Sequence, residues 1–226
     1  MKLLAIDTAT EACSAALLIE GNVQSEYQIA PQQHADLILP MVEKLLAEAA
    51  IKLNQLDAIA FGRGPGSFTG VRIATSVTQG LAYGADIPVV PVSTLATMAQ
   101  RIYREQQKSK VLAVIDARIS EVYWAVYQLD KNNLMQLQGE ESVIAPENVP
   151  LPEGDDWYGV GTGWGSYRAQ LENRLGNRIT GSQSKYFPHA MDMIPQAVFS
   201  FEQGLAVPAE QALPVYLRDK VAVKKA

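Results

Sequence analysis

The chain has 226 residues, of which 48% are hydrophobic and 19% are charged, and its formal net charge is −5. This composition predicts a packed globular core, in one large domain or two small ones. The acidic total argues against a protein that grips phosphate backbones unaided, because such proteins carry a basic face.

The cysteine and hydropathy patterns exclude two further classes of protein. The single cysteine, Cys13, allows no internal disulfide and suits a reducing compartment. The first apolar run stops at Asp7, so we expect no signal peptide, and no apolar stretch approaches the roughly 18 residues of a membrane span. We therefore expect a cytoplasmic protein that does not cross a membrane.

The first part of the chain reads as a strand meander followed by alternating helices and strands. The predicted strands lie at residues 3–7, 12–20, 23–29, 57–61 and 87–92. Predicted helices lie at 35–50, at 69–85, and after Ser93, which is a candidate N-cap. An opening meander differs from the strand–helix start of a Rossmann fold.

A polar stretch at residues 101–110 marks the predicted domain boundary, with halves at 1–106 and 107–226. The second half begins again with strands, at residues 111–116, 121–129 and 157–160, and has a loop at 145–156. Helices are expected from Ser166 and over 189–201, where Pro195 favours a kink. We expect this last helix to pack back on the first half.

Two short sequences recur in the same order and in the same strand context. LAID at 4–7 matches AVID at 113–116, and GRGPG at 62–66 matches GTGWG at 161–165. One four-residue match is open to chance, but two in order favour a duplication. The predicted fold is therefore α/β: a duplicated actin-like (ASKHA, ribonuclease H-like) fold with a reduced second half. In this class, which includes sugar kinases and chaperone ATPases, a nucleotide lies between the halves.

By that analogy, four residues are candidates for a vestigial nucleotide cleft: Asp7, Gly64, Gly66 and Asp116. A glycine turn before a helix offers N–H groups and a positive helix end to an anion. The alternative is structural, because aspartates cap strand ends and glycines permit tight turns. The run at 62–70 lacks a P-loop lysine and the dinucleotide-binding spacing, which favours the structural interpretation of the glycines.

Metal and hydrolytic chemistry are not expected. His34 and His189 lie far apart, and no His-x-x-x-His or paired-cysteine spacing exists. A triad built on Ser14 or Cys13 with His34 finds no support in the spacing, and no Gly-x-Ser-x-Gly elbow is present. His34 is better explained as the start of a helix.

Four longer motifs stand out: LAIDTAT at 4–10, GPGSFTGVRI at 64–73, DAR at 116–118 with EVY at 121–123, and PVYLR at 214–218. Together they resemble the TsaB (YeaZ) family. The GPGSFTGVR run is highly specific. The resemblance implies an actin-like fold and a role in the bacterial machinery that makes threonylcarbamoyladenosine (t6A) beside the anticodon of tRNAs reading codons that begin with A.

The resemblance also implies partners and the loss of a metal site. The partners are TsaD, which transfers the threonylcarbamoyl group, and TsaE, a small ATPase. We expect a homodimer when the chain is alone, and tRNA contact only through the complex. In TsaD a His-x-x-x-His pair holds the catalytic metal, and Thr94 and Met98 stand at the matching positions. Neither residue suits that site, so the chain is expected to be a non-catalytic activator without a metal or cofactor.

Two other functions stay open at this stage. One is an actin-like ATPase or small-molecule kinase that uses Asp7 and Asp116 around a phosphate, with ATP or ADP in the cleft. The other is a peptidase, which the missing triad and metal site argue against.

A stripe of small residues marks a candidate partner surface on the predicted helix at 69–85, beside the helix at 35–50. The stripe consists of Gly70, Ala74, Thr78 and Ala82, and Gly80 with Gly84 forms a second small pair. It would let a helix of TsaD or of a second copy approach closely, unless it packs against the chain's own sheet. The basic C-terminal residues are either solvated or a supporting RNA contact: Arg218, Lys220, Lys224 and Lys225.

Overall fold

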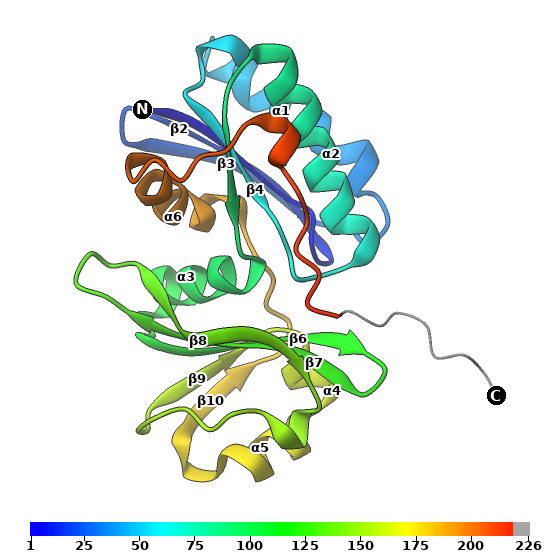
Figure 1. The fold of residues 1–226 in the computed structure, drawn as a ribbon, viewed down its shortest axis with the longest axis vertical. Coiled ribbons are helices and arrows are strands. Elements are labelled where there is room, and N and C mark those ends of the chain that lie inside the picture. Colours follow the sequence, from blue (N-terminus) through cyan, green and yellow to red (C-terminus); the bar gives the residue numbers. More distant parts are fainter. Residues whose placement is uncertain (219–226) are drawn as a thin grey trace, which may run out of the picture.

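The computed structural model describes residues 1–218 as two five-stranded sheets with helices around and between them (Figure 1). The strand orders are β3-β2-β1-β4-β5 and β8-β7-β6-β9-β10, so the second sheet repeats the first. In each sheet the first three strands form an antiparallel meander and the last two run parallel to its first strand. This shared topology confirms the duplication predicted from the two recurring sequences.

The central strands of the first sheet are buried on both faces, whereas its edge strand β3 is exposed or half-buried. Its strands are β1 (Lys2–Asp7), β2 (Ala12–Ile19), β3 (Asn22–Ile29), β4 (Ala58–Gly62) and β5 (Val89–Val92). Helices α1 (His34–Glu48) and α2 (Phe68–Ala85) cover one face, against side chains such as Leu4 and Ile6. Leu3 and Ala5 point to the other face. Because successive side chains of β1 point to opposite faces and both faces are buried, the sequence of β1 is a continuous apolar run.

The second sheet carries smaller helices on its outer face. Its strands are β6 (Lys110–Arg118), β7 (Glu121–Leu129), β8 (Met135–Ile144), β9 (Trp157–Val160) and β10 (Ile179–Gln183). Helices α4 (Gly163–Ser166) and α5 (Arg168–Leu175) stand where the first half has the 18-residue α2. Both pack on the sheet through the core around Trp124 and Trp164. The second half is therefore the reduced one.

Two helices each pack on the sheet of the other half of the chain. Helix α3 (Thr94–Gln106) follows the first sheet in sequence but packs its Leu95 and Ile102 on the second sheet. Helix α6 (Ala190–Glu202) follows the second sheet but packs its Met193 on the first. The two helices contact each other between the sheets (Figure 1). The proposed division at 106/107 therefore separates the strands of the two sheets, whereas packing interleaves the helices.

Ion pairs and hydrogen bonds hold the two exchanged helices together. Arg104 donates to both oxygens of Asp192, from Nε at 2.6 Å and from Nη2 at 3.1 Å. The Asp192 side chain is 1% exposed. His189 caps α6 by accepting the Met191 N–H on Nδ1 at 3.3 Å. Burial, followed by the charges of Arg101 and Arg104, lowers the pKa of His189 to about 4, so the ring stays neutral and can accept.

A third contact between the halves involves the loop after β4. Arg63 in that loop pairs with Glu141 of β8, with 3.2 Å between Nη2 and Oε2. The other carboxylate oxygen, Oε1, accepts from the N-cap hydroxyl of Ser93 and from the Tyr127 hydroxyl. The Glu141 side chain is only 6% exposed, so these three donors satisfy a buried charge.

Within residues 1–218, no helix is long and apolar enough to cross a bilayer.

Candidate functional site

A cleft of about 950 Å³ lies between the two halves. The first half contributes the turn after β1, the loop into α1 and the start of α2, while the second contributes the β6–β7 hairpin and the start of α4. Val215, Tyr216 and Arg218 also line the cleft. Of the four residues predicted for a nucleotide cleft, Gly66 and Asp116 line it, whereas Asp7 and Gly64 are buried and do not.

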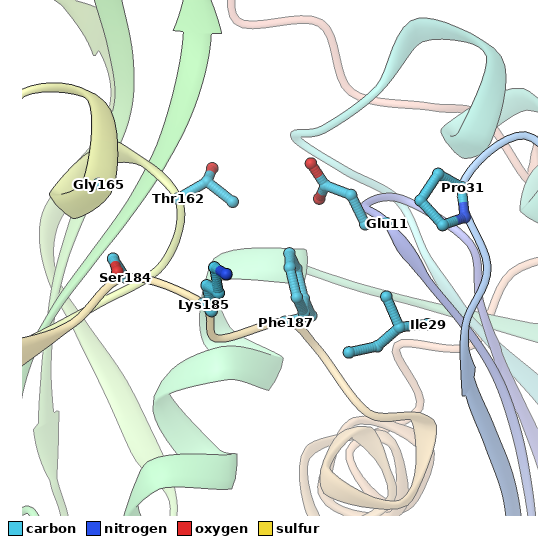
Figure 2. Close-up of a pocket in the computed structure, with 8 residues that line it drawn as sticks. All are labelled: Glu11, Ile29, Pro31, Thr162, Gly165, Ser184, Lys185 and Phe187. Carbon is cyan, nitrogen blue, oxygen red and sulfur yellow. The ribbon is translucent and has the colours of Figure 1, made fainter.

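A second pocket of about 530 Å³ adjoins this cleft, because Glu11, Pro31 and Thr162 line both. Figure 2 shows its walls: Glu11 and Ile29 lie on the first-half side, and Lys185 lies across from them on the chain between β10 and α6. The two pockets form one groove along the junction of the halves.

The glycine loop at 62–70 is held close to the chain after β1. A Cβ at Gly66 would overlap the carbonyl oxygen of Ala9, and one at Gly70 would overlap that of Thr8. Ser67 N–H donates to Ala9 O at 2.7 Å, and Thr8 Oγ1 donates to Gly70 O at 2.6 Å. The glycines are therefore needed for close backbone approach, as the structural interpretation predicted.

Asp7 ends β1 in a fully buried position. Its Oδ1 accepts the Ala9 N–H at 2.9 Å, and Oδ2 has no hydrogen-bond partner in the described chain. Gly62 packs so closely that a Cβ there would overlap Oδ2. Burial raises the pKa of Asp7 to about 7. A carboxyl that is sealed and partly protonated near neutral pH is a poor ligand for a cation in the cleft.

Asp116, the counterpart of Asp7, is more open but already occupied. Its Oδ2 accepts from Ser166 Oγ at 2.8 Å, and its Oδ1 accepts from the Arg118 N–H at 2.8 Å and the Tyr167 hydroxyl at 3.4 Å. Thr162 Oγ1 accepts from the Asp116 N–H at 3.0 Å. These contacts tie the β6–β7 hairpin to the turn before α4, which fits the strand-end cap that was the alternative for this residue.

The segment 212–218 crosses from one half to the other along the cleft. On the first half, Gln79 Nε2 donates to Ala212 O at 2.9 Å and Val215 N–H donates to Arg63 O at 2.8 Å. On the second half, Arg218 pairs with Glu121 and donates to Arg118 O. Arg218, which the sequence placed in a basic tail, is thus an anchor, while Lys220, Lys224 and Lys225 lie outside the described residues.

An arginine packed against two aromatic rings lines the cleft, and the sequence alone did not indicate it as a site residue. We call the part of the cleft formed by Phe68, Arg72, Tyr216 and Arg118 the cleft mouth. The Arg72 guanidinium lies 3.2 Å from the Phe68 ring centroid and 4.9 Å from that of Tyr216. Phe68 is 63% exposed and Tyr216 is 48% exposed. The helical spacing of Phe68 and Arg72 was a readable signal, but Tyr216 reaches them only through the crossing segment.

Comparison with known proteins decides the family. The protein-family model described as TsaD, tRNA N6-adenosine threonylcarbamoyltransferase, matches residues 21–222 of this chain. The chain is 46% identical along its whole length to the Escherichia coli tRNA threonylcarbamoyladenosine biosynthesis protein TsaB, covering 98% of it. The Haemophilus influenzae protein of the same name is 41% identical, with 100% of this chain and 97% of that protein covered.

Solved structures agree. The chain superimposes on YeaZ from Pseudomonas aeruginosa with a TM-score of 0.89 and 52% identity, covering 96% of this chain and 99% of that one. A second Pseudomonas aeruginosa structure, described as similar to peptidase YeaZ, matches equally well. The chain belongs to the TsaB (YeaZ) family. This confirms the resemblance and the actin-like fold.

In this TsaB family member, the positions that the resemblance matches to the TsaD metal histidines are sealed. Thr94 and Met98 both have 0% exposure, and Met98 belongs to the core between α3 and the second sheet. A Cβ at Gly161 would clash with Met98 Cε. Within residues 1–218, no group of three or more His, Cys, Asp or Glu side chains is arranged to hold a metal.

The small-residue stripe predicted as a partner surface is buried within the chain itself. Gly70, Ala74, Thr78 and Ala82 all face the first sheet, and Ala74 and Ala82 belong to its core. These four side chains are therefore not accessible to a partner helix in this structure, and their burial favours the alternative of packing on the chain's own sheet. A four-residue period identifies one face of a helix but does not say which way it points.

The opposite face of α2 is the accessible one, and it also carries small residues. Ser76, Gly80 and Gly84 are exposed at four-residue intervals. A Cβ at Gly80 or Gly84 would meet nothing within 4 Å. Tyr83 beside them is 79% exposed. The second small pair of the sequence analysis thus lies on the surface.

The glycine loop gives a direct test of close packing. Gly66→Ala and Gly70→Ala should each destabilise the protein by about 3 kcal/mol, because the new methyl group overlaps a backbone carbonyl that cannot move aside. Gly80→Ala on the open face of α2 is the matched control and should stabilise the helix by about 1 kcal/mol. Urea unfolding measures all three. Equal effects at the three positions would contradict the assigned contacts.

Asp7 predicts a pH dependence of stability. Its folded pKa of about 7 lies above the ordinary value of 3.8, so the folded state binds the proton more tightly and loses stability as pH rises between those values. Relative to Asp7→Asn, the wild type should lose on the order of 4 kcal/mol between pH 4 and pH 7. Urea unfolding across that range checks this, with exposed Asp155→Asn as control. A constant difference between wild type and Asp7→Asn would show that Asp7 titrates normally.

Proposed function

We propose that this chain is a non-catalytic partner and activator of TsaD in the formation of t6A in tRNA. Its relatives are named as tRNA threonylcarbamoyladenosine biosynthesis proteins. The observation that carries the non-catalytic part is the closed packing around Thr94 and Met98, which leaves no opening for a metal or substrate. The place of action would be the cytoplasm, where tRNA is modified.

The nucleophile needed by a peptidase finds no support in the site. Ser14 Oγ is buried and accepts the Ala190 N–H at 3.0 Å. Cys13 is fully buried, and burial together with the nearby Asp7 raises the pKa of its thiol to about 12. His34 Nε2 has no hydrogen-bond partner among the described residues, so no base is aligned with either group.

A kinase or ATPase is disfavoured by what the cleft residues already do. Asp7 is sealed, Asp116 accepts from the chain's own donors, and the Ser67 N–H of the glycine loop is used internally. Kinases of this fold class also close their halves around the nucleotide. Here Arg63–Glu141 and Arg104–Asp192 join the halves through buried carboxylates, which favours a fixed platform.

The exposed face of α2, with the neighbouring α1, is our proposed contact surface for TsaD and for a second copy of the chain. Ser76, Gly80 and Gly84 leave room for a helix to approach closely, and the exposed Tyr83 and Leu39 add apolar contact area. Because TsaD shares the fold family, it could occupy the same surface pseudo-symmetrically. TsaE and tRNA would join through the resulting complex.

Reconstitution tests the function. With TsaD, TsaE, the threonylcarbamoyl adenylate and tRNA present, omitting this chain should reduce t6A formation to background, because TsaD lacks its activator. The chain with adenylate and tRNA alone should make none. Mass spectrometry of digested tRNA provides the readout. Modified adenosine formed by this chain without TsaD would refute the proposal, as would full TsaD activity in its absence.

Charge and bulk on α2 test the surface. Gly80→Arg should weaken both self-association and TsaD binding by at least about tenfold, or about 1.4 kcal/mol, since it places an unpaired charge in a close helix contact. The fold should survive because the position faces open space. Ala169→Arg on the exposed side of α5 is the control. Ultracentrifugation and calorimetry measure the two affinities, and a folded Gly80→Arg variant with wild-type values would place the interface elsewhere.

A further inference from the structure

The cleft mouth presents a stacked platform to solvent. Arg72 packs against the Phe68 ring, donates from Nη1 to Phe68 O at 3.1 Å, and lies beside the Tyr216 ring. The two rings are tilted by 37° with centroids 6.4 Å apart. Both rings remain about half exposed or more, so each keeps a free surface on which another flat group can stack.

The platform lies in a locally basic part of an acidic protein. Within residues 1–218, neither Arg72 nor the exposed Arg118 has a carboxylate within 4.0 Å, although both line the cleft. Glu11 and Asp116 are the carboxylates of the lining, and Glu121 is paired with Arg218. The charged residues that line the cleft are therefore three arginines and two carboxylates, in a chain of net charge −5.

We propose that this mouth is a contact site for single-stranded RNA, in particular an unpaired tRNA loop presented within the TsaD complex. Bases splayed out of a loop stack on aromatic rings and guanidinium planes, and arginines without carboxylate partners are free to contact phosphates. The two features occur together here at Phe68, Arg72, Tyr216 and Arg118. The inference rests on the proposed function and names the substrate surface that this chain adds to the complex.

A protein partner would fit the same place less well. Protein interfaces bury an apolar centre and pair their arginines with carboxylates. The mouth instead combines exposed rings with unpaired arginines around an open cleft. The apolar, small-residue surface at Gly80 and Gly84 is the part of α2 that matches a protein contact.

Site-specific crosslinking separates the two partners. The photoreactive residue p-benzoylphenylalanine replaces Tyr216 in one preparation and Tyr83 in another, each assembled with TsaD and TsaE and irradiated with end-labelled tRNA. Position 216 should capture RNA, and position 83, at the far end of α2, should capture protein only. Capture of protein alone at position 216, or of nothing, would overturn the proposal.

Kinetics of the assembled complex provide the second readout. Arg72→Gln and Arg118→Gln should each raise KM for tRNA on the order of tenfold with kcat unchanged, and should lower the salt dependence by about one phosphate contact. Lys131→Gln, beyond the end of β7 opposite to the cleft, removes one positive charge at an exposed residue that does not line the cleft, and it should change neither. Size-exclusion chromatography confirms assembly of each variant. If wild-type protein activates TsaD but both cleft variants keep its KM, the RNA contact is wrong while the proposed function stands. If wild-type protein gives no activation, the proposed function itself is wrong.

Discussion

The contact on which the structure depends most is the ion pair between Arg104 and Asp192. The Asp192 carboxylate is 1% exposed and would carry an uncompensated charge without its partner. The pair joins α3 and α6, the two helices that belong to one half by sequence and pack on the sheet of the other. Each helix therefore needs the other half to cover its apolar side. A second ion pair, Arg63–Glu141, lies at the start of α3, where Glu141 also accepts from the N-cap residue Ser93. Together the two ion pairs and the two helices join the halves.

Two ion pairs with buried carboxylates join the halves, and under the proposed function they would keep the shape of a nucleotide cleft without the motion that phosphoryl-transfer enzymes use. The residues at the base of the cleft have structural partners: Gly66 and Gly70 admit the backbone of Thr8 and Ala9, and Asp116 ties a hairpin to a turn. What remains available lies outside this base. The open face of α2 offers room for a helix, and the cleft mouth offers stacking surfaces and positive charge. These two surfaces share one helix, so under the proposed function one small chain could bind TsaD and contact RNA at once.

The sequence predicted those parts of the fold that local chemistry repeats. Aspartates recur near the ends of β1 and β6, and glycine turns recur after β4 and β9, because the two sheets have the same topology. The duplication and the main elements could therefore be predicted from the sequence. Strands β8 and β10 were missed because β8 is polar and largely exposed, and β10 has only Ile179 as an apolar residue. The direction of the small stripe was missed because both faces of α2 carry small residues. The Phe68–Arg72–Tyr216 platform forms only because the segment 212–218 crosses the cleft, and hydrogen bonds to Arg63 and Gln79 hold that segment in place. No local sequence pattern predicts these long-range hydrogen bonds.

Whether the two halves are held fixed is tested most directly by the distance between spin labels on opposite halves. Glu48→Cys on α1 and Gln170→Cys on α5 are exposed labelling sites. The native Cys13 does not compete, because it is fully buried and its thiol pKa is raised to about 12. Electron–electron resonance on labelled protein diluted with unlabelled protein should give one narrow distance distribution, unchanged by magnesium ATP. A second population, or a shift of several ångströms on adding ATP, would show that the halves open and close like those of an enzyme.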